Sequence, residues 1–156
     1  MSALVLLDTG PLGMVTHPKT ATNGPAARWV EQLLAAGVRL LVPEIADYEL
    51  RRELLRANLS QSIARLDALE SELGFDPIQT ETMRQAAAFW ARARNIGQPT
   101  ADDKALDGDM ILAAHSAVLT QRGFTVTIAT TNVGHLSRFA RASLWNDLTP
   151  AKAQAP

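Results

Sequence analysis

The sequence contains no cysteine, which excludes disulfide bonds, a thiol nucleophile and thiolate metal ligands. It also lacks an excess of either charge, because 15 basic residues balance 16 acidic ones and the formal net charge is -1. This balance argues against a protein that coats nucleic acid through bulk positive charge, and it leaves room for a local basic groove.

Long apolar runs are missing as well. A membrane-spanning helix needs about 20 apolar residues, and no run in the chain approaches that length. The apolar stretch at residues 4–7 ends at Asp8 and follows no basic residue, so it does not resemble a secretory signal. We therefore expect a cytoplasmic protein that does not bind membranes.

The remaining composition is typical of one soluble domain. The chain has 156 residues, of which 47% are hydrophobic and 20% are charged. A domain of this size buries roughly two thirds of the surface that its unfolded chain exposes, so it needs no covalent cross-links. We expect one domain over residues 1–148, followed by a flexible tail over residues 149–156.

Apolar runs and amphipathic segments alternate along the chain. Short apolar or β-branched runs predict buried strands at residues 4–7, 38–42 and 124–129, with shorter strands at 75–78 and 143–145. Helical periodicity predicts helices at residues 23–36, 44–56, 60–73, 81–95 and 107–121. The alternation predicts an α/β fold, a single-domain three-layer α/β/α sandwich with a mostly parallel central sheet.

Functional sites in such folds form at the carboxyl ends of the strands, and this rule selects a few polar residues. Asp8 directly follows the first strand, and Asn132 closely follows the last long strand. Glu49 lies in the helix after the second strand, and Asp107 and Asp109 stand at the expected start of another helix. Together these residues predict an acidic cleft at one edge of the sheet.

Each of these residues also has a purely structural interpretation. Asp8 suits a turn that accepts backbone N–H groups, and Asp107 and Asn132 suit helix N-caps. Glu49 and Glu53 lie one helical turn apart, and either could form an ordinary surface pair with an arginine. Spacing alone does not choose between the two glutamates.

The chemistry of an acidic cleft points to a metal ion. Carboxylates that crowd together repel one another, and some of their pKa values rise unless a cation lies between them. Mg²⁺ and Mn²⁺ prefer oxygen ligands and can bridge to a phosphate. The cluster therefore predicts metal-assisted phosphoryl chemistry.

Four segments of the chain follow one another in a familiar order. They are residues 6–9 (Leu-Leu-Asp-Thr), 43–50 (Pro-Glu-Ile-Ala-Asp-Tyr-Glu-Leu), 109–114 (Asp-Met-Ile-Leu-Ala-Ala) and 130–136 (Thr-Thr-Asn-Val-Gly-His-Leu). Their order and spacing resemble the motifs of the PIN-domain ribonucleases, the family that includes the VapC-type toxins of bacterial toxin–antitoxin pairs. The likeness spans nearly the whole chain.

This resemblance implies a Mg²⁺- or Mn²⁺-dependent endoribonuclease. Asp8, Glu49 and Asp109 would be its acidic metal ligands, with Asp107 as an additional acid. Asn132 takes a catalytic position that is Asp in some members, and here it carries no charge. A water activated at the metal is expected to attack phosphorus in line, without a covalent enzyme intermediate.

Other expectations concern the substrate and the partners. Thr9 and Thr131 are expected to orient the carboxylates or bind phosphate, and Arg51 and Arg52 to hold substrate phosphates. The expected substrate is single-stranded or looped RNA. The resemblance also implies a homodimer and an antitoxin protein that covers the cleft. His135 stands near a position where many members place another acid.

Two other function classes fit parts of the pattern. Strand-end aspartates also serve in phosphoryl-transfer domains, yet the phosphatases of that kind usually carry a second Asp two residues later, where this chain has Gly10. A non-catalytic interaction module could keep the same fold and the same acidic pocket. Dependence on a metal ion would separate the nuclease from the interaction module.

Overall fold

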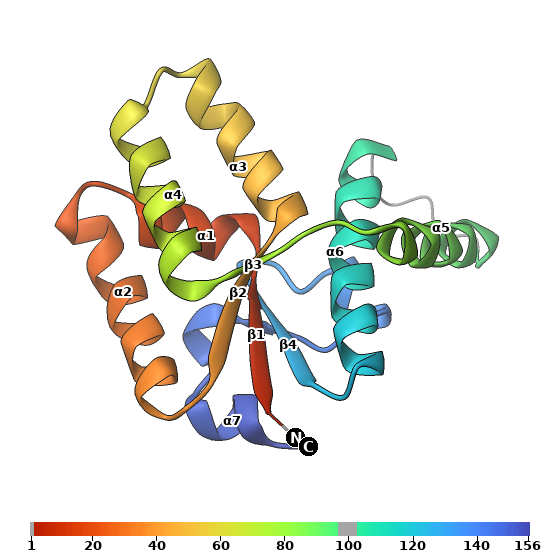
Figure 1. The fold of residues 1–156 in the computed structure, drawn as a ribbon. Coiled ribbons are helices and arrows are strands. Elements are labelled where there is room, and N and C mark those ends of the chain that lie inside the picture. Colours follow the sequence, from red (N-terminus) through yellow and green to blue (C-terminus); the bar gives the residue numbers. More distant parts are fainter. Residues whose placement is uncertain (1, 97–102) are drawn as a thin grey trace.

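The computed structural model describes residues 2–96 and 103–156, and these form three layers with a sheet in the middle (Figure 1). The strands are β1 (Ala3–Leu7), β2 (Arg39–Pro43), β3 (Phe75–Asp76), β4 (Thr125–Thr130) and β5 (Ala142–Leu144). They lie in the order β3-β2-β1-β4-β5, and each neighbouring pair is parallel. The predicted α/β/α sandwich with a parallel sheet is therefore confirmed.

Seven α-helices surround this sheet within the described residues. They are α1 (Thr9–Thr16), α2 (Thr20–Ala35), α3 (Glu44–Arg56), α4 (Ser60–Leu73), α5 (Thr80–Asn95), α6 (Asp103–Gln121) and α7 (Pro150–Gln154). Short 3-10 helices cover His135–Arg138 and Trp145–Asp147. None of the described helices combines the length and the apolar character that crossing a bilayer requires.

The order of the strands places beside β1 the kind of reversal at which open α/β sheets have their ligand-binding crevice. The chain first builds outward from β1 to β2 and β3, and it then crosses to β4 and β5 on the other side. The direction of winding thus reverses between β1 and β4. The carboxyl ends of the strands at such a reversal are where ligands bind in open α/β sheets.

Strand β1 is buried on both of its faces, as its apolar sequence predicts. Its odd-numbered residues pack into a core shared with α1, α2, α4 and α7, and Leu4 and Leu6 pack into a second core with α5 and α6. Side chains alternate between the two faces of a strand. Asp8, which keeps an extended backbone, therefore points to the same side as Leu4 and Leu6, toward α6.

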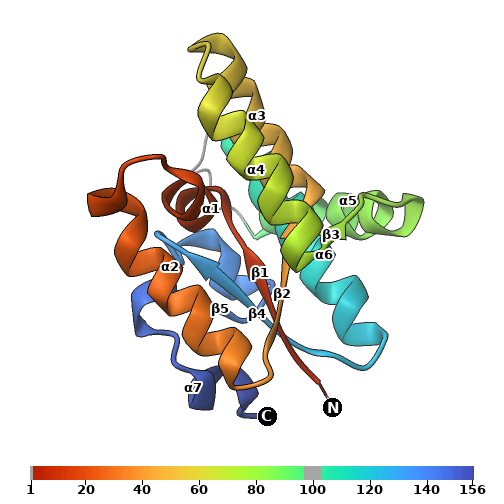
Figure 2. The same cartoon turned by 60° about the vertical axis from the view of Figure 1, so that its left-hand side comes forward.

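Helices α3 and α4 form an antiparallel pair that extends beyond the sheet. Both views show this pair on the side of the carboxyl ends of the strands, away from the two chain termini (Figures 1 and 2). The bounds of both helices are those that the sequence predicts. The pair thus carries α3 beyond the carboxyl end of β1.

Two helices near the carboxyl edge of the sheet differ from the sequence prediction. The sequence predicts a turn after Asp8, yet helix α1 starts at Thr9, because Asp8 caps it and Pro11 falls in the first turn, where a missing N–H costs nothing. Helix α6 starts at Asp103, so Asp107 lies inside the helix and is not its N-cap. The segment between the predicted helices at 81–95 and 107–121, which we interpret as a polar loop, falls mostly on residues 97–102, which are outside the described residues.

The end of the chain differs from the predicted flexible tail. Residues 149–156 instead contain helix α7, whose first turn is capped by the Thr149 hydroxyl, which accepts a hydrogen bond from the Lys152 N–H. Pro150 suits the first position of this helix, and Ala153 is buried against the core that includes β1. The sequence of this segment did not predict the helix, because Ala153 is its one buried residue and a single alanine gives no apolar pattern.

Candidate active site

Asp8 is held at the carboxyl end of β1 by two hydrogen bonds. Its Oδ1 accepts the Thr9 N–H at 2.7 Å, which is the N-cap bond of α1. Its Oδ2 accepts the Thr130 hydroxyl at 2.7 Å. Asp8 thus caps a helix, which is its structural role. The same bond also fixes its carboxylate, which remains half-buried at the crevice and is free to serve a functional role.

Thr130 links the ends of β1 and β4. Its hydroxyl donates to Asp8 and accepts the N–H of Asn132 at 3.1 Å. Thr130 is buried, so this short relay is shielded from water. The loop after β4 is thereby fixed relative to the carboxylate that follows β1.

Glu49 reaches the same crevice from α3. The Thr9 hydroxyl donates to Glu49 Oε1 at 3.2 Å, so Thr9 contacts the carboxylates of both Asp8 and Glu49. On the other side, Glu49 lies against α6 at Gly108, where an added Cβ would stand 2.9 Å from Glu49 Oε2. Glu53, the alternative glutamate, instead forms an exposed ion pair with Arg56 at 2.9 Å.

Asp109 completes the acidic group from α6. Burial raises the pKa of Asp109 to about 6, and the Asp8 carboxylate raises it as well. His135 lowers the pKa of Asp109 by its charge, and the Glu49 carboxylate raises it further. His135 therefore lies near Asp109, at the place where the family resemblance puts another acid.

The pKa of Glu49 is also raised, first by burial and then by the Asp8 carboxylate. The Thr9 hydrogen bond and the positive charge of Arg52 act in the opposite direction. Three carboxylates from β1, α3 and α6 thus influence one another, and the proton affinity of two of them rises. We call Asp8, Glu49 and Asp109 the acidic cluster.

The donor atoms of the acidic cluster suit a hard divalent cation. All are carboxylate oxygens, and a cation between them would relieve the repulsion that raises the pKa values. Among residues 2–96 and 103–156, however, no three acidic or histidine side chains are gathered closely enough to form a ready metal site. The cluster therefore fits Mg²⁺ or Mn²⁺ by its chemistry, and its side chains would have to move inward to coordinate the ion.

Two of the other predicted residues lie at the edge of the cluster. Thr131 packs against the start of α1, where a Cβ on Gly10 would stand 2.7 Å from Thr131 Cγ2. Asn132 is exposed at the end of β4, and a Cβ on Gly134 would stand 3.1 Å from its Oδ1. Both residues are at the carboxyl edge of the sheet, as the sequence predicts.

The two predicted arginines have different surroundings. Arg51 pairs with Asp47 on its own helix at 2.8 Å and with Asp67 on α4 at 2.7 Å, and it lies 3.8 Å from Glu70 on α4. It therefore braces α3 against α4 and is not available for substrate phosphates. Arg52 is exposed and close enough to Glu49 to lower its pKa.

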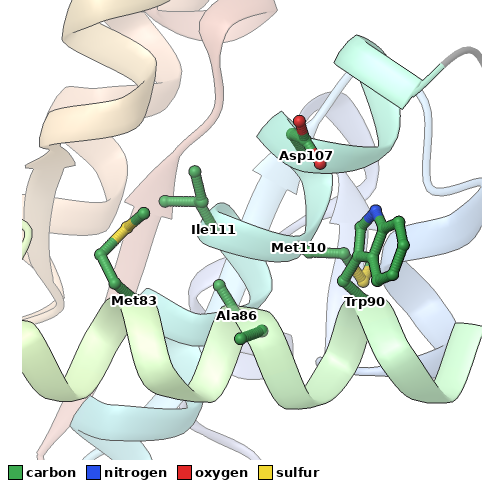
Figure 3. A pocket seen from close by; sticks show the side chains of 7 residues that line it. Met83, Ala86, Trp90, Asp107, Met110 and Ile111 are labelled. Atoms are coloured by element: carbon green, nitrogen blue, oxygen red, sulfur yellow. The ribbon is translucent and has the colours of Figure 1, made fainter.

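Asp107 does not join the acidic cluster. Residues two apart in a helix face different sides, and Asp107 shares a face of α6 with Met110 and Ile111. These three residues line an apolar cavity of about 360 Å³ between α5 and α6 (Figure 3). The opposite wall comes from α5, with Met83, Ala86, Ala87 and Trp90. An apolar lining of this kind does not suit a metal ion or a phosphate.

Sequence reasoning missed two residues that shape the acidic cluster. Thr130 orients Asp8, and Gly108 makes room for Glu49. The sequence did contain a signal for Thr130. Any sheet that brings Asp8 and Asn132 together must place their two strands side by side, and Thr130 then ends beside Asp8. Gly108 offered a weaker signal, since a glycine inside a helix costs stability and needs a reason.

No protein-family model matches the sequence, and no curated protein matches it. Its fold does match solved structures. VapBC2 from Rickettsia felis, solved with a promoter DNA fragment, gives a TM-score of 0.68 at 16% identity, over 90% of this chain and 97% of the other. FitAcB from Neisseria gonorrhoeae gives 0.66 at 19% identity, over 92% and 99% of the two chains. VapBC-1 from nontypeable Haemophilus influenzae gives 0.66 at 20% identity, over 91% and 98%.

These matches cover nearly the full length of both chains in each pair, and the neighbours are toxin–antitoxin complexes. The TM-scores of 0.66–0.68 over this length establish a common fold, at identities of 16–20%. The chain therefore has the PIN-like fold of the VapC-type toxins, and the resemblance seen in the sequence is confirmed at the level of the fold.

Proposed function

We propose that this chain is a Mg²⁺- or Mn²⁺-dependent endoribonuclease and the toxin of a toxin–antitoxin pair. The observation that carries the proposal is the convergence of Asp8, Glu49 and Asp109, from three separate elements, at the reversal point of a PIN-like sheet. Carboxylates are brought together at such a cost only where a cation or a proton is to be held.

Asp8, Glu49 and Asp109 would hold the metal ion. When bound, the ion would supply charge for a phosphate oxygen and lower the pKa of a water. The chain itself does the positioning: Thr9 fixes Asp8 and Glu49, and Thr130 fixes Asp8 from the other side. Glu49 and Asp109 both have raised pKa values, so either carboxylate is suited to take a proton from the attacking water.

The substrate in this proposal is single-stranded RNA. The acidic cluster lies at the carboxyl edge of the sheet, where Asp8 follows β1 and Glu49 reaches Thr9 from α3. An unpaired strand can bend into a site of this kind and turn its bases outward, whereas a duplex is stiff and keeps its bases stacked and paired inside.

The test is cleavage of a mixed pool of single-stranded RNAs, with Mn²⁺, with Mg²⁺ or with a chelator. The variants Asp8→Asn, Glu49→Gln and Asp109→Asn should each abolish cleavage that wild type shows with metal. Glu53→Gln is the matched control, because Glu53 lies one turn from Glu49 and pairs with Arg56 on the surface. Calorimetric titration with Mn²⁺ alone gives a second readout, in which the three cluster variants should lose heat of binding.

A well-folded wild type that binds no Mn²⁺ and cleaves no RNA in the pool would overturn the nuclease proposal. That result would favour a non-catalytic interaction module. Such a module needs no metal ion, and among the described residues no three acidic or histidine side chains form a ready metal site.

An antitoxin partner and a homodimer belong to the same proposal. The support for an antitoxin is that VapBC2, FitAcB and VapBC-1, which share this fold, are toxin–antitoxin complexes. Such a protein would neutralise the nuclease by covering the acidic cluster, and an arginine is the side chain best suited to pair with its carboxylates. Sedimentation of the purified chain alone tests for the homodimer. Sedimentation together with the product of a neighbouring gene tests for the antitoxin complex.

A further inference from the structure

An exposed aromatic residue stands directly beside the acidic cluster. Tyr48, the sole tyrosine of the chain, precedes Glu49 on α3, and its side chain is 57% exposed. The Arg52 guanidinium lies over its ring, with Cζ 5.1 Å from the ring centroid. An exposed tyrosine is common by itself, but one that is stacked with arginine at the rim of an active site calls for an explanation.

The position of Arg52 connects Tyr48 with the acidic cluster. Arg52 is one helical turn from both Tyr48 and Glu49, so its side chain neighbours both on the surface of α3, and its guanidinium stacks on the Tyr48 ring. Its guanidinium thus lies within reach of the aromatic ring and of the Glu49 carboxylate. A positive charge and an aromatic face therefore stand side by side where a substrate would approach the cluster.

The other arginines of α3 do not offer this arrangement. Arg51 is engaged with Asp47 and Asp67, and Arg56 pairs with Glu53. Arg52 instead lies over an aromatic ring and is exposed. An acidic cluster repels a polyanion, so a cation from the chain beside the cluster favours the entry of a phosphate backbone.

We propose that Tyr48 and Arg52 form a nucleotide-binding subsite, in which one unpaired base of the RNA stacks on Tyr48 and Arg52 contacts the adjoining phosphate. The inference rests on the proposed nuclease function and extends it to a specific part of the substrate. Aromatic stacking accepts any base, so the subsite would anchor a nucleotide beside the cleaved bond without selecting a sequence.

A protein partner is the main alternative occupant of this surface. Leu55 lies two turns after Tyr48 on the same side of α3 and is 58% exposed. A helix docked on α3 would cover both residues, whereas one base stacked on Tyr48 would leave Leu55 untouched. Leu55→Ala therefore discriminates between the two occupants and is the matched control for Tyr48→Ala.

The experiment measures binding of a labelled single-stranded heptanucleotide to the full chain in chelator, where no metal-dependent cleavage occurs. Tyr48→Ala should weaken binding roughly 5- to 100-fold, and Tyr48→Phe should retain it, because the ring is what stacks. Leu55→Ala should bind like wild type. A heptanucleotide with one abasic position should lose the difference between wild type and Tyr48→Ala.

Arg52→Gln tests the phosphate contact. The slope of log affinity against log salt concentration should fall by about 0.7, the value for one phosphate contact on a single strand. In cleavage assays with Mn²⁺, Tyr48→Ala should raise KM with little change in kcat, as expected for a residue that binds substrate away from the reacting atoms.

Two different failures can be told apart. If wild type binds and cleaves RNA while Tyr48→Ala binds equally well, the subsite is wrong and the nuclease proposal stands. If wild type neither binds nor cleaves RNA, the nuclease proposal is wrong and the subsite falls with it. If Tyr48→Ala and Leu55→Ala both leave RNA binding intact and both shift the sedimentation toward a monomer, the surface is an interface between protein chains.

Discussion

The Thr130 hydroxyl donates a hydrogen bond of 2.7 Å to Asp8 Oδ2, and it joins the ends of two neighbouring parallel strands. Thr130 thereby leaves Asp8 little freedom to rotate, since Oδ1 is held by the N-cap bond to Thr9. A carboxylate fixed at both oxygens presents its remaining lone pairs in a defined direction. The first prediction follows from this arrangement.

Thr130→Val should weaken Mn²⁺ binding 10- to 100-fold while the fold is retained. The substitution keeps the shape of the side chain and removes the hydroxyl that orients Asp8, and losses of this size are typical when the partner of a metal ligand is removed. Calorimetric titration with Mn²⁺ measures the effect. Thr130→Ser, which keeps the hydroxyl, should restore most of the affinity.

The same strand provides a control for this substitution. Thr127 is buried on β4, and its hydroxyl has no hydrogen-bond partner among the residues that the structure describes. Thr127→Val should leave Mn²⁺ binding unchanged and should not lower the melting temperature, because burying an unsatisfied hydroxyl is costly. Equal losses of affinity in both valine variants would show that the hydrogen bond to Asp8 is not what matters.

Asp8 illustrates what the sequence predicts well. An apolar strand that ends in an acid identifies the carboxyl edge of a parallel sheet, and that local pattern needs no knowledge of distant residues. Glu49 illustrates the opposite case. The helical pattern does not separate it from Glu53, and the distinction arises from contacts with Thr9 on α1 and Gly108 on α6, far away along the chain.

Arg51 shows why a substrate-binding role could not be judged from the sequence. Its pairing with Asp47 is visible as a spacing of four residues, yet Asp67 lies on α4 and comes close only because α3 and α4 pack as an antiparallel pair. For Thr130 the error lay in the end of the strand. The predicted strand ended at Ala129, so its boundary was one residue short: β4 includes Thr130, whose side chain lies on the face of Ile128 and reaches Asp8.

Gly108→Ala should impair the acidic cluster without destabilising the protein. The added Cβ would stand 2.9 Å from Glu49 Oε2, so the flexible end of Glu49 must shift from its present position. Alanine is about 1 kcal/mol more favourable than glycine inside a helix, which offsets the local crowding. We expect at least a tenfold loss of metal-dependent cleavage, with a melting temperature equal to or above that of wild type.

Gly13→Ala is the matched control for this change. Gly13 also lies in a helix, and its added Cβ would meet Leu50 Cδ1 at 3.6 Å, an ordinary contact. This variant should cleave RNA like wild type. A Gly108→Ala protein with full activity would show that Glu49 tolerates displacement and does not act from its present position.

Asp109→Asn should stabilise the metal-free protein at neutral pH. The pKa of Asp109 is raised to about 6, above its ordinary value of 3.8, so the folded state binds the proton more tightly than the unfolded state. The stability of the wild type therefore falls as the pH rises from about 4 through 6. After discounting for partial exposure, we expect a gain of about 1 kcal/mol, or roughly 2–4 °C, at pH 7.5 in chelator.

The stabilisation by Asp109→Asn should vanish below pH 4, where the wild-type carboxyl is protonated as well. Mn²⁺ should reverse the order, because only the wild type gains stability from binding. Asp147→Asn, at an exposed position, should change neither result. Thermal melts at pH 3.5 and pH 7.5 test the sign, and a variant that is less stable than wild type at pH 7.5 in chelator would contradict the repulsion within the cluster.

Glu70→Gln should flatten the dependence of stability on pH between 5 and 8. Burial raises the pKa of Glu70 to about 8, and the neighbouring Asp47 carboxylate raises it as well. The folded state thus retains a proton that the unfolded state loses near pH 4.5, so the wild type loses stability as the pH rises through this range. Glutamine resembles the protonated acid and has no proton to lose.

Melting temperatures at pH 6 and 8.5 measure the effect of Glu70→Gln. Glu72→Gln, at an exposed position two residues further along α4, should keep the slope of the wild type. An unchanged slope in Glu70→Gln would mean that Arg51 holds Glu70 in its charged form, and the brace between α3 and α4 would then be an ordinary ion pair.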